Sequence, residues 1–212
     1  MGEPDRVLSV GCLLYLAGDQ VAPRKTGPWN LRVPCKRVWV DLSEVRAIVG
    51  AASYLSLRDS GHVTLRVVES SNSYRSRKGA ETIRGIILKV VNSTPPDGLP
   101  GEVLKATLAL THGDPRPRIL GAQGSDLHKA LSGGLLGMLR YELLELDYAD
   151  LRFPSIFYWL RFDCTRIAAL EEACADAVRW WQQVQVAELA LSSALLEACR
   201  IAFTPPQPDG GG

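Results

Sequence analysis

The spacing of hydrophobic residues changes once along the segment from Leu42 to Glu69, and the change predicts a helix followed by a strand. Between Leu42 and Leu57, apolar residues recur at the spacing of an amphipathic helix. From His62 onward they alternate with polar residues, as on a half-buried strand. The intervening Asp-Ser-Gly at 59–61 is typical of a turn. A second apolar run, from Ile83 to Val91, is well placed to return as the antiparallel partner.

Residues 42–91 therefore have the order helix, turn, strand, turn, strand, which is the outline of a winged-helix-like unit. The same periodicity predicts helices at 101–111, from residue 126 onward, and from about residue 163 to 203 with an interruption near Gln182. The aromatic run from Phe153 to Phe162 predicts one strand of a second hairpin.

Three other segments give weaker signals. Residues 7–17 are apolar but too short to separate a buried strand from a short helix. Residues 19–37 contain three prolines and are expected to form a loop that leads into a short strand at 36–41. Residues 111–124 are expected to be irregular because of Pro115 and Pro117.

These elements predict an α-rich α+β protein with a helical core, β-hairpins and winged-helix-like units. At 212 residues the chain is long enough to bury a sizeable core, and residues 1–203 are expected to form a single domain around the central unit at 42–91. The tail at 204–212 is rich in proline and glycine and is expected to be disordered.

The formal net charge is only +1, but the charges are distributed unevenly. Residues 1–126 carry 17 Lys and Arg against 12 Asp and Glu, whereas residues 127–212 carry 7 against 11. An anionic partner is therefore expected to meet the first part of the chain.

Within that part, five cations and no acid lie between Asp19 and Asp41, around Trp29. Cations attract an anionic membrane surface, and tryptophan favours the membrane interface. A solvated loop held by one buried indole is the alternative explanation. The candidate site that this pattern indicates comprises Arg24, Lys25, Trp29, Arg32, Lys36 and Arg37. Its expected partner is an anionic membrane lipid or an acidic protein.

Nucleic acid is an alternative partner. The polar linker between the two strands of the 42–91 unit carries Arg75, Arg77 and Lys78, and wings of winged-helix domains contact phosphates. The helix that would enter a major groove offers chiefly Arg46 and Arg58 as long donors. A third alternative is a module that binds other proteins without lipid or nucleic acid.

The sequence contains none of the catalytic, phosphate-loop or metal-binding motifs that would indicate an enzyme or a cofactor. We therefore expect a non-enzymatic protein without cofactor or metal. The five cysteines form no CxxC pair, and their odd number favours a reducing cytosol. Of these, Cys12, Cys174 and Cys199 lie among apolar residues and are expected to be buried thiols. The acidic start of the chain does not resemble a signal peptide, so we expect a cytoplasmic protein that can act peripherally at a membrane.

The order of these segments resembles that of the Golgi phosphoprotein 3 family of peripheral membrane proteins. The resemblance rests on LSVGCLLYL, the tryptophan loop, a helix ending in YLSLRDSGHVTL, and VVNSTPPDGLPGEVLKATLAL. It implies a mostly helical domain whose basic face binds phosphatidylinositol 4-phosphate, with Trp29 and Arg46 in the places of lipid-contacting residues. The family's two arginines on a later helix have no match, because this stretch offers only Lys129 and Arg140 as cations. The resemblance here implies an anionic contact without headgroup specificity.

Overall fold

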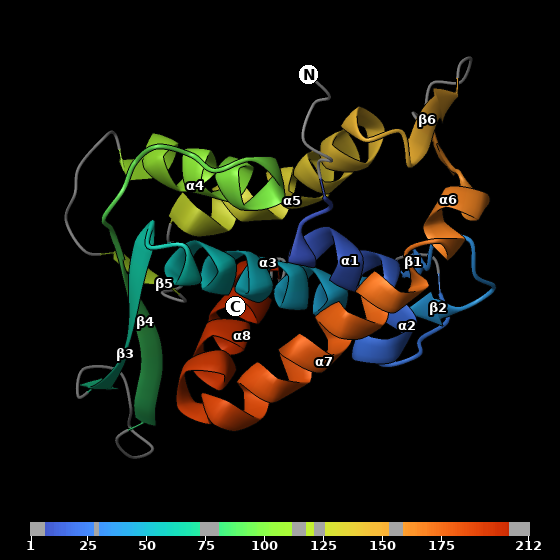
Figure 1. The fold of residues 1–212 in the computed structure, drawn as a ribbon. Helices are drawn as coiled ribbons and strands as arrows, with labels where there is room; N and C mark the ends of the chain where they lie inside the picture. Colours follow the sequence, from blue (N-terminus) through green and yellow to red (C-terminus); the bar gives the residue numbers. More distant parts are fainter. Residues whose placement is uncertain are drawn as a thin grey trace, which may run out of the picture.

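The computed structural model describes residues 7–27, 30–72, 81–111, 118–120, 126–152 and 159–203. Its centre is helix α3, Leu42–Asp59, which packs against α1, Val10–Leu16, and α8, Leu189–Phe203. In Figure 1, α4, Gly98–Thr111, and α5, Asp126–Glu145, lie on one side of α3, and α7, Glu171–Ala187, and α8 lie on the other. The prediction of an α-rich α+β fold in one domain is confirmed.

The sequence of α3 explains both its start and its central position. Asp41 caps the helix by accepting the backbone N–H groups of Ser43 and Glu44, at 2.9 Å and 3.4 Å. Beyond the first turn nearly every side chain is buried, and Tyr54 at the core is fully inaccessible to solvent. The helix is therefore enclosed by its neighbours on most of its circumference.

Two ion pairs hold α3 antiparallel to α8, one near each end. At the start of α3, Glu44 accepts hydrogen bonds from Arg200 Nε and Nη2 at 2.9 Å and 2.6 Å. At its end, both terminal nitrogens of Arg58 bond to Glu188, the residue that precedes α8. Two-point contacts of this kind fix the direction of a helix pair as well as attracting it.

The helix-and-hairpin unit predicted over 42–91 is present. After Gly61, which adopts a φ of +76°, β3, Val63–Asn72, pairs antiparallel with β4, Glu81–Val90. The sheet has a third strand, because β5, Arg118–Leu120, pairs with β4. The expectation of irregular chain throughout 111–124 is therefore wrong for these three residues. The prolines precede β5, which keeps its own N–H groups for the ladder.

At the other end of the molecule from this sheet, a second group of short elements lies beyond the N-terminus of α3 (Figure 1). The group comprises α2, Gly18–Val21; β1, Leu31–Arg32; β2, Trp39–Val40; β6, Ala149–Arg152; β7, Trp159–Phe162; and α6, Cys164–Ala168. Here β1 pairs with β2, and β6 pairs with β7. Because the segment 19–37 contains part of α2 and all of β1, the expectation of a plain loop there is wrong. Its prolines exclude helix only from Pro23 onward.

The apolar segment 7–17, which the sequence leaves open between strand and helix, forms α1 at Val10–Leu16. Two predicted boundaries differ from the structure. Helix α4 begins at Gly98 instead of residue 101, because Pro100 is tolerated in a first helical turn. The C-terminal helical stretch is interrupted at 169–170 and at Glu188, whereas Gln182 lies within α7. The second hairpin is confirmed for β6 with β7, whereas residues 153–158 of the aromatic run and the tail at 204–212 lie outside the described residues.

Candidate functional site

A hollow of about 400 Å³ opens at the N-terminus of α3. It is lined by residues 25–27 and 41–43 together with Asn30 and Arg46. These residues come from the segment before β1 and from the capped first turns of α3. The fold thus brings together Lys25 and Arg46, two of the cations that the sequence assigned to the candidate site.

On one wall, Asp41 is occupied by partners from within the protein. Its carboxylate caps α3 and accepts a hydrogen bond from Lys25 Nζ at 2.8 Å. Burial by itself would raise the pKa of Asp41, but the hydrogen bonds from Lys25, Ser43 and the backbone together lower it to about 2. The Asp41 carboxylate is therefore ionised at neutral pH, and the charge of Lys25 compensates it.

On the other wall, no ion pair joins Arg46 to an acid among the described residues. Its Nε is buried and makes no hydrogen bond with any of the described residues. The pKa of Arg46 is lowered, first by its burial and second by repulsion from Arg140 on α5. Burial raises the pKa of the Tyr15 hydroxyl to about 12, and the charge of Arg140 opposes that rise. Positive charge from Arg140 thus acts on Arg46, whose Nε has no acceptor among the described residues.

The remaining candidate cations occupy different positions. Lys36 forms an ion pair with Asp19 at 2.6 Å, and Arg32 Nε donates to the backbone oxygen of Lys36. Arg24 and Arg37 are exposed. The acids that bound this segment in sequence, Asp19 and Asp41, thus fold back onto two of its cations. The expectation that the stretch is uncompensated because it contains no acid is therefore wrong for Lys25 and Lys36.

Several predicted site residues cannot be placed. Trp29 lies outside the described residues, although its sequence neighbours Gly27 and Asn30 both line the hollow. Arg75, Arg77 and Lys78 also lie outside the described part of the chain. The charge of Arg140, 94 positions further along the chain, acts on Arg46 and lowers its pKa after the larger effect of burial, which no local pattern could have indicated.

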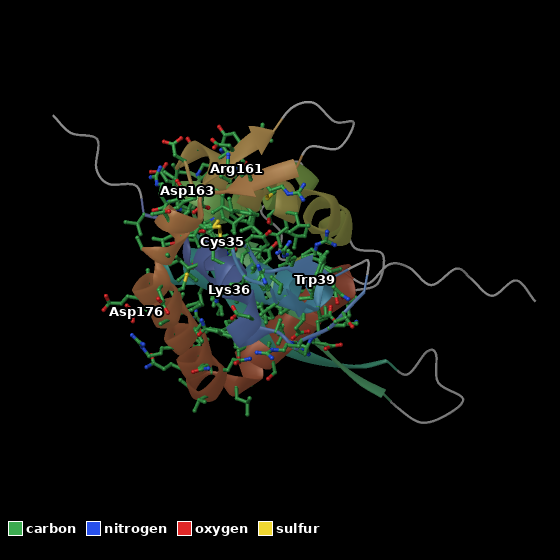
Figure 2. The ribbon with its side chains drawn as sticks, turned by 90° about the vertical axis from the view of Figure 1, so that its right-hand side faces the viewer. Cys35, Lys36, Trp39, Arg161, Asp163 and Asp176 are labelled. Atoms are coloured by element: carbon green, nitrogen blue, oxygen red, sulfur yellow. A yellow bond between two sulfur atoms is a disulfide. The ribbon has the colours of Figure 1, made fainter. Side chains whose placement is uncertain are left out.

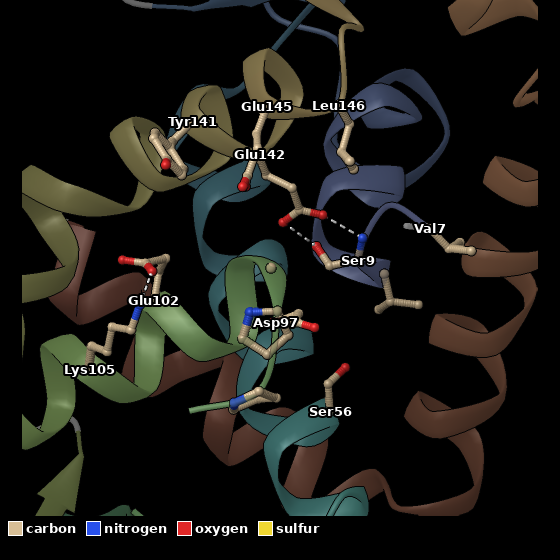
Figure 3. A pocket seen from close by; sticks show the side chains of 14 residues that line it. Val7, Ser9, Ser56, Asp97, Glu102, Lys105, Tyr141, Glu142, Glu145 and Leu146 are labelled. Carbon is tan, nitrogen blue, oxygen red and sulfur yellow. Dashed lines mark hydrogen bonds and ion pairs between the residues drawn. The ribbon is translucent and has the colours of Figure 1, made fainter. Parts of the chain in front are cut away.

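A second and larger hollow, of about 580 Å³, has the opposite character (Figure 3). Its floor is Glu142 of α5, which is only 4% exposed. The carboxylate of Glu142 accepts the Ser9 N–H at 2.6 Å, the Ser9 hydroxyl at 3.0 Å and the Leu99 N–H at 2.6 Å. Because Ser9 and Leu99 lie at the starts of α1 and α4, this one side chain ties three helices together. The charge is satisfied by the fold itself.

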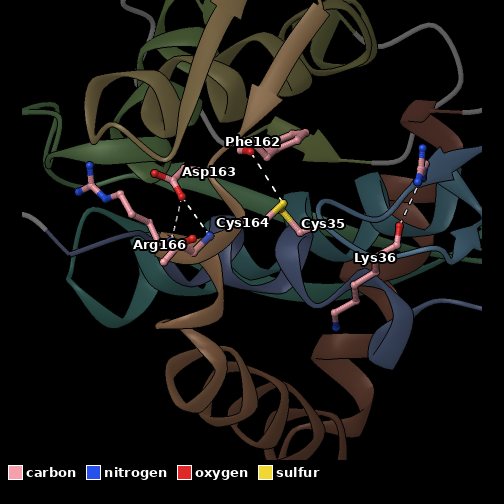
Figure 4. The surroundings of a disulfide bond; sticks show 8 residues. Cys35, Lys36, Phe162, Asp163, Cys164 and Arg166 are labelled. Atoms are coloured by element: carbon pink, nitrogen blue, oxygen red, sulfur yellow. Dashed lines mark hydrogen bonds between the residues drawn. A yellow bond between two sulfur atoms is a disulfide. The ribbon is translucent and has the colours of Figure 1, made fainter.

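A disulfide joins Cys35, between β1 and β2, to Cys164 at the start of α6 (Figures 2 and 4). The sequence offered no disulfide framework as a reason to expect a reducing cytosol, and this pair removes that reason. The local sequence around each cysteine could not reveal the pairing, since 129 positions separate them. The prediction for Cys12, Cys174 and Cys199 is confirmed, because all three are buried free thiols.

Comparison of the chain with family models, with curated proteins and with solved structures gives no match. Among the described residues, no three His, Cys, Asp or Glu side chains are grouped so that they could hold a metal ion. None of the helices in this part of the chain is both long and apolar enough to cross a bilayer. The candidate site is thus defined by its charges alone.

Proposed function

We propose that this protein is a non-enzymatic peripheral membrane adaptor that contacts anionic lipid headgroups through the hollow at the N-terminus of α3. Arg46 and Lys25 line the hollow, and Arg140, which is not among the lining residues, adds positive charge that acts on Arg46. The observation that carries the proposal is the buried Arg46 Nε, which has no acceptor among the described residues.

A bound anion would stabilise Arg46 for two reasons. A buried donor without an acceptor costs about 1–3 kcal/mol, and repulsion between two guanidinium groups adds to that cost. An oxyanion beside Arg46 supplies an acceptor for Nε and offsets the repulsion from Arg140. Guanidinium groups bind phosphate in a planar two-point geometry, which suits a lipid phosphate better than an isolated carboxylate.

The chain around the hollow fits an encounter with a membrane surface. Lys25 and Arg24 are exposed beside it, and the sequence places Trp29 between two residues that line it. An exposed cation near an anionic leaflet contributes about 1 kcal/mol, and an indole favours the interface. The resemblance to the Golgi phosphoprotein 3 family points to the same class of ligand, with phosphatidylinositol 4-phosphate as the headgroup to try first.

The nucleic-acid alternative receives less support. It needs a helix with a free face, and α3 buries Ala47, Ala51 and Ser53 on the face where base contacts were sought. Its other half depends on Arg75, Arg77 and Lys78, which the structure does not describe. Binding to nucleic acid therefore stays a prediction, as does a cytoplasmic location.

The proposal is tested by flotation with phosphatidylcholine vesicles that contain phosphatidylinositol 4-phosphate, phosphatidylserine or neither. We expect the protein to float with the anionic vesicles and to be released by salt. If each arginine contributes about 1 kcal/mol, Arg46→Gln and Arg140→Gln together weaken binding roughly thirtyfold. Arg179→Gln is the matched control, because Arg179 is paired with Asp176 on α7, away from the hollow.

Equal flotation on all three vesicles, or equal loss with Arg179→Gln and with the paired variant, contradicts the proposal. A preference for phosphatidylinositol 4-phosphate over phosphatidylserine at equal surface charge indicates headgroup recognition instead of general attraction to an anionic surface.

A further inference from the structure

The disulfide and the anion hollow lie at opposite ends of the same short hairpin. Cys35 lies at the closed end, in the turn between β1 and β2, while Asn30 and Asp41 flank its open end and line the hollow. The two strands are only two residues long, paired as Leu31 with Val40 and Arg32 with Trp39. A change in the turn at the closed end is therefore separated from the residues that line the hollow by only two residues of each strand.

The turn at the closed end holds Cys35 in an unfavourable conformation. The Lys36 N–H donates to the Val33 carbonyl oxygen at 3.1 Å, which closes a four-residue turn with Pro34 second and Cys35 third. The φ of Cys35 is +59°, and this third position in a turn with proline second normally takes glycine or asparagine. Nothing in the cysteine side chain favours such a backbone, and the bond to Cys164 restrains it in addition to the hydrogen bond that closes the turn.

The disulfide is also accessible. Cys35 and Cys164 are both exposed, whereas the three other cysteines of the chain are buried. Burial raises the pKa of Cys12 and Cys199, which keeps these thiols protonated and unreactive. A reductant from solvent therefore meets this disulfide before it meets any internal thiol.

We propose that the Cys35–Cys164 disulfide is a redox-sensitive clasp that holds the hairpin of residues 31–40 in place and keeps the anion hollow assembled. A dithiol reductant opens it in two exchange steps. One thiolate attacks a cysteine sulfur to form a mixed disulfide, and the second thiolate displaces that cysteine. Two electrons and two protons pass to the protein, which gains two thiols, and the reductant becomes a disulfide. Cys35 is then able to leave its positive φ, and the turn opens.

Complete loss of the hairpin is not expected on reduction. Val33 and Val40 are buried in the core, and Lys36 stays paired with Asp19. The predicted change is thus a local loosening of the turn, with weaker anion binding as its consequence. The binding consequence rests on the proposed function, whereas the loosening does not.

The test measures backbone hydrogen exchange of the full chain before and after treatment with a dithiol, with alkylation to count thiols. We expect three alkylated cysteines in unreduced denatured protein and five after reduction. On reduction, the Lys36 N–H should exchange about tenfold faster, in keeping with the penalty on a left-handed non-glycine residue. The His62 N–H, which bonds to Leu57 O far from the hairpin, is the internal reference and should not change.

A pair of variants separates loosening of the turn from general damage. Both carry Cys164→Ser; one adds Cys35→Gly and the other Cys35→Ala. Glycine adopts a positive φ without penalty, so the glycine variant should keep slower exchange at residue 36 than the alanine variant. Neither variant should respond to the dithiol.

Five thiols alkylated without reductant, or unchanged exchange at residue 36 after full reduction, overturns the clasp. Equal exchange in the two variants overturns the role given to the turn. Vesicle flotation that is weaker in the reduced protein supports the link to the hollow. If neither form floats while exchange at residue 36 still responds, the proposed function fails and the clasp stands.

Discussion

Glu142 lines the larger hollow and Arg46 lines the smaller one. The surroundings of these two charged side chains differ. Glu142 is buried and accepts three hydrogen bonds from the starts of two other helices. Arg46 is half-buried, and its buried Nε bonds to none of the described residues. Interior polar groups are nearly always paired, so a paired charge indicates a structural role and an unpaired one indicates a missing partner.

The comparison also shows why hollow size is a poor guide to function here. The Glu142 hollow is the larger of the two, at about 580 Å³ against about 400 Å³. Gly98, at a φ of +73°, brings the start of α4 against the Glu142 carboxylate, and a side chain there would crowd it. That hollow is therefore built around a contact which the protein already makes.

The largest expected effect comes from removing the satisfied charge. Glu142→Ala leaves three donors without an acceptor, and each such buried donor costs about 1–3 kcal/mol. We expect the free energy of unfolding to fall by about 3–5 kcal/mol, measured by urea denaturation monitored by circular dichroism.

Glu102→Ala is the control for that experiment, because Glu102 lines the same hollow but forms a surface ion pair with Lys105. A change below about 1 kcal/mol is expected there. Equal effects from the two variants would remove the structural role assigned to Glu142.

Local sequence predicts much of the fold and part of the candidate site. The remaining features depend on contacts between residues that are far apart in the chain. The period of apolar residues predicts α3 and the hairpin that follows it, because this pattern is local to the segment. The family resemblance places Arg46 in the site. No local pattern predicts that its Nε is buried without an acceptor among the described residues, because burial depends on the elements that pack around it.

The errors have the same physical origin. The sequence places Asp19 and Asp41 at the limits of a basic segment, yet the chain folds so that each pairs with a lysine inside it. The Cys35–Cys164 bond joins residues whose neighbourhoods carry no common pattern. Tertiary pairing of this kind is set by the topology of the whole chain.

Replacing Arg46 should change the free energy of unfolding in the opposite direction from Glu142→Ala and by a smaller amount. Arg46→Met keeps most of the side-chain volume and removes both the unpaired Nε and the repulsion with Arg140. We expect the free energy of unfolding to stay constant or to rise by about 1 kcal/mol in thermal and urea unfolding.

Arg58→Met on the same helix is the matched control, because Arg58 bonds to Asp59 and Glu188. This variant should lose stability. A loss of similar size in Arg46→Met would mean that Arg46 has a partner and would remove the reason for proposing an anion there.

The smallest effect concerns pH. The folded protein holds the pKa of Asp41 at about 2, below its ordinary value of 3.8, so folding favours the carboxylate. The stability that Asp41 contributes is complete above about pH 4 and is lost as the pH falls from there toward 2. Because Lys25 is largely exposed, we expect that contribution to be below about 1 kcal/mol.

Asp41→Asn isolates the stability that the charge of Asp41 contributes, since asparagine also caps helices but does not titrate. The difference in urea midpoint between the wild type and this variant should be constant from pH 7 to pH 5 and shrink below pH 4. A difference that stays constant down to pH 2 would mean that Asp41 is not held by Lys25 and the cap.

The central claim is that the unpaired charge at Arg46 marks an anion site, and unfolding at increasing inorganic phosphate tests it most directly, with ionic strength held constant by sodium chloride. A ligand that binds only the folded state raises the free energy of unfolding, by about 2.7 kcal/mol at a hundred times its dissociation constant. We predict a rise with phosphate in the wild type and in Arg179→Gln, and a flat response in Arg46→Met. The same rise in all three proteins, or in none, would contradict the claim.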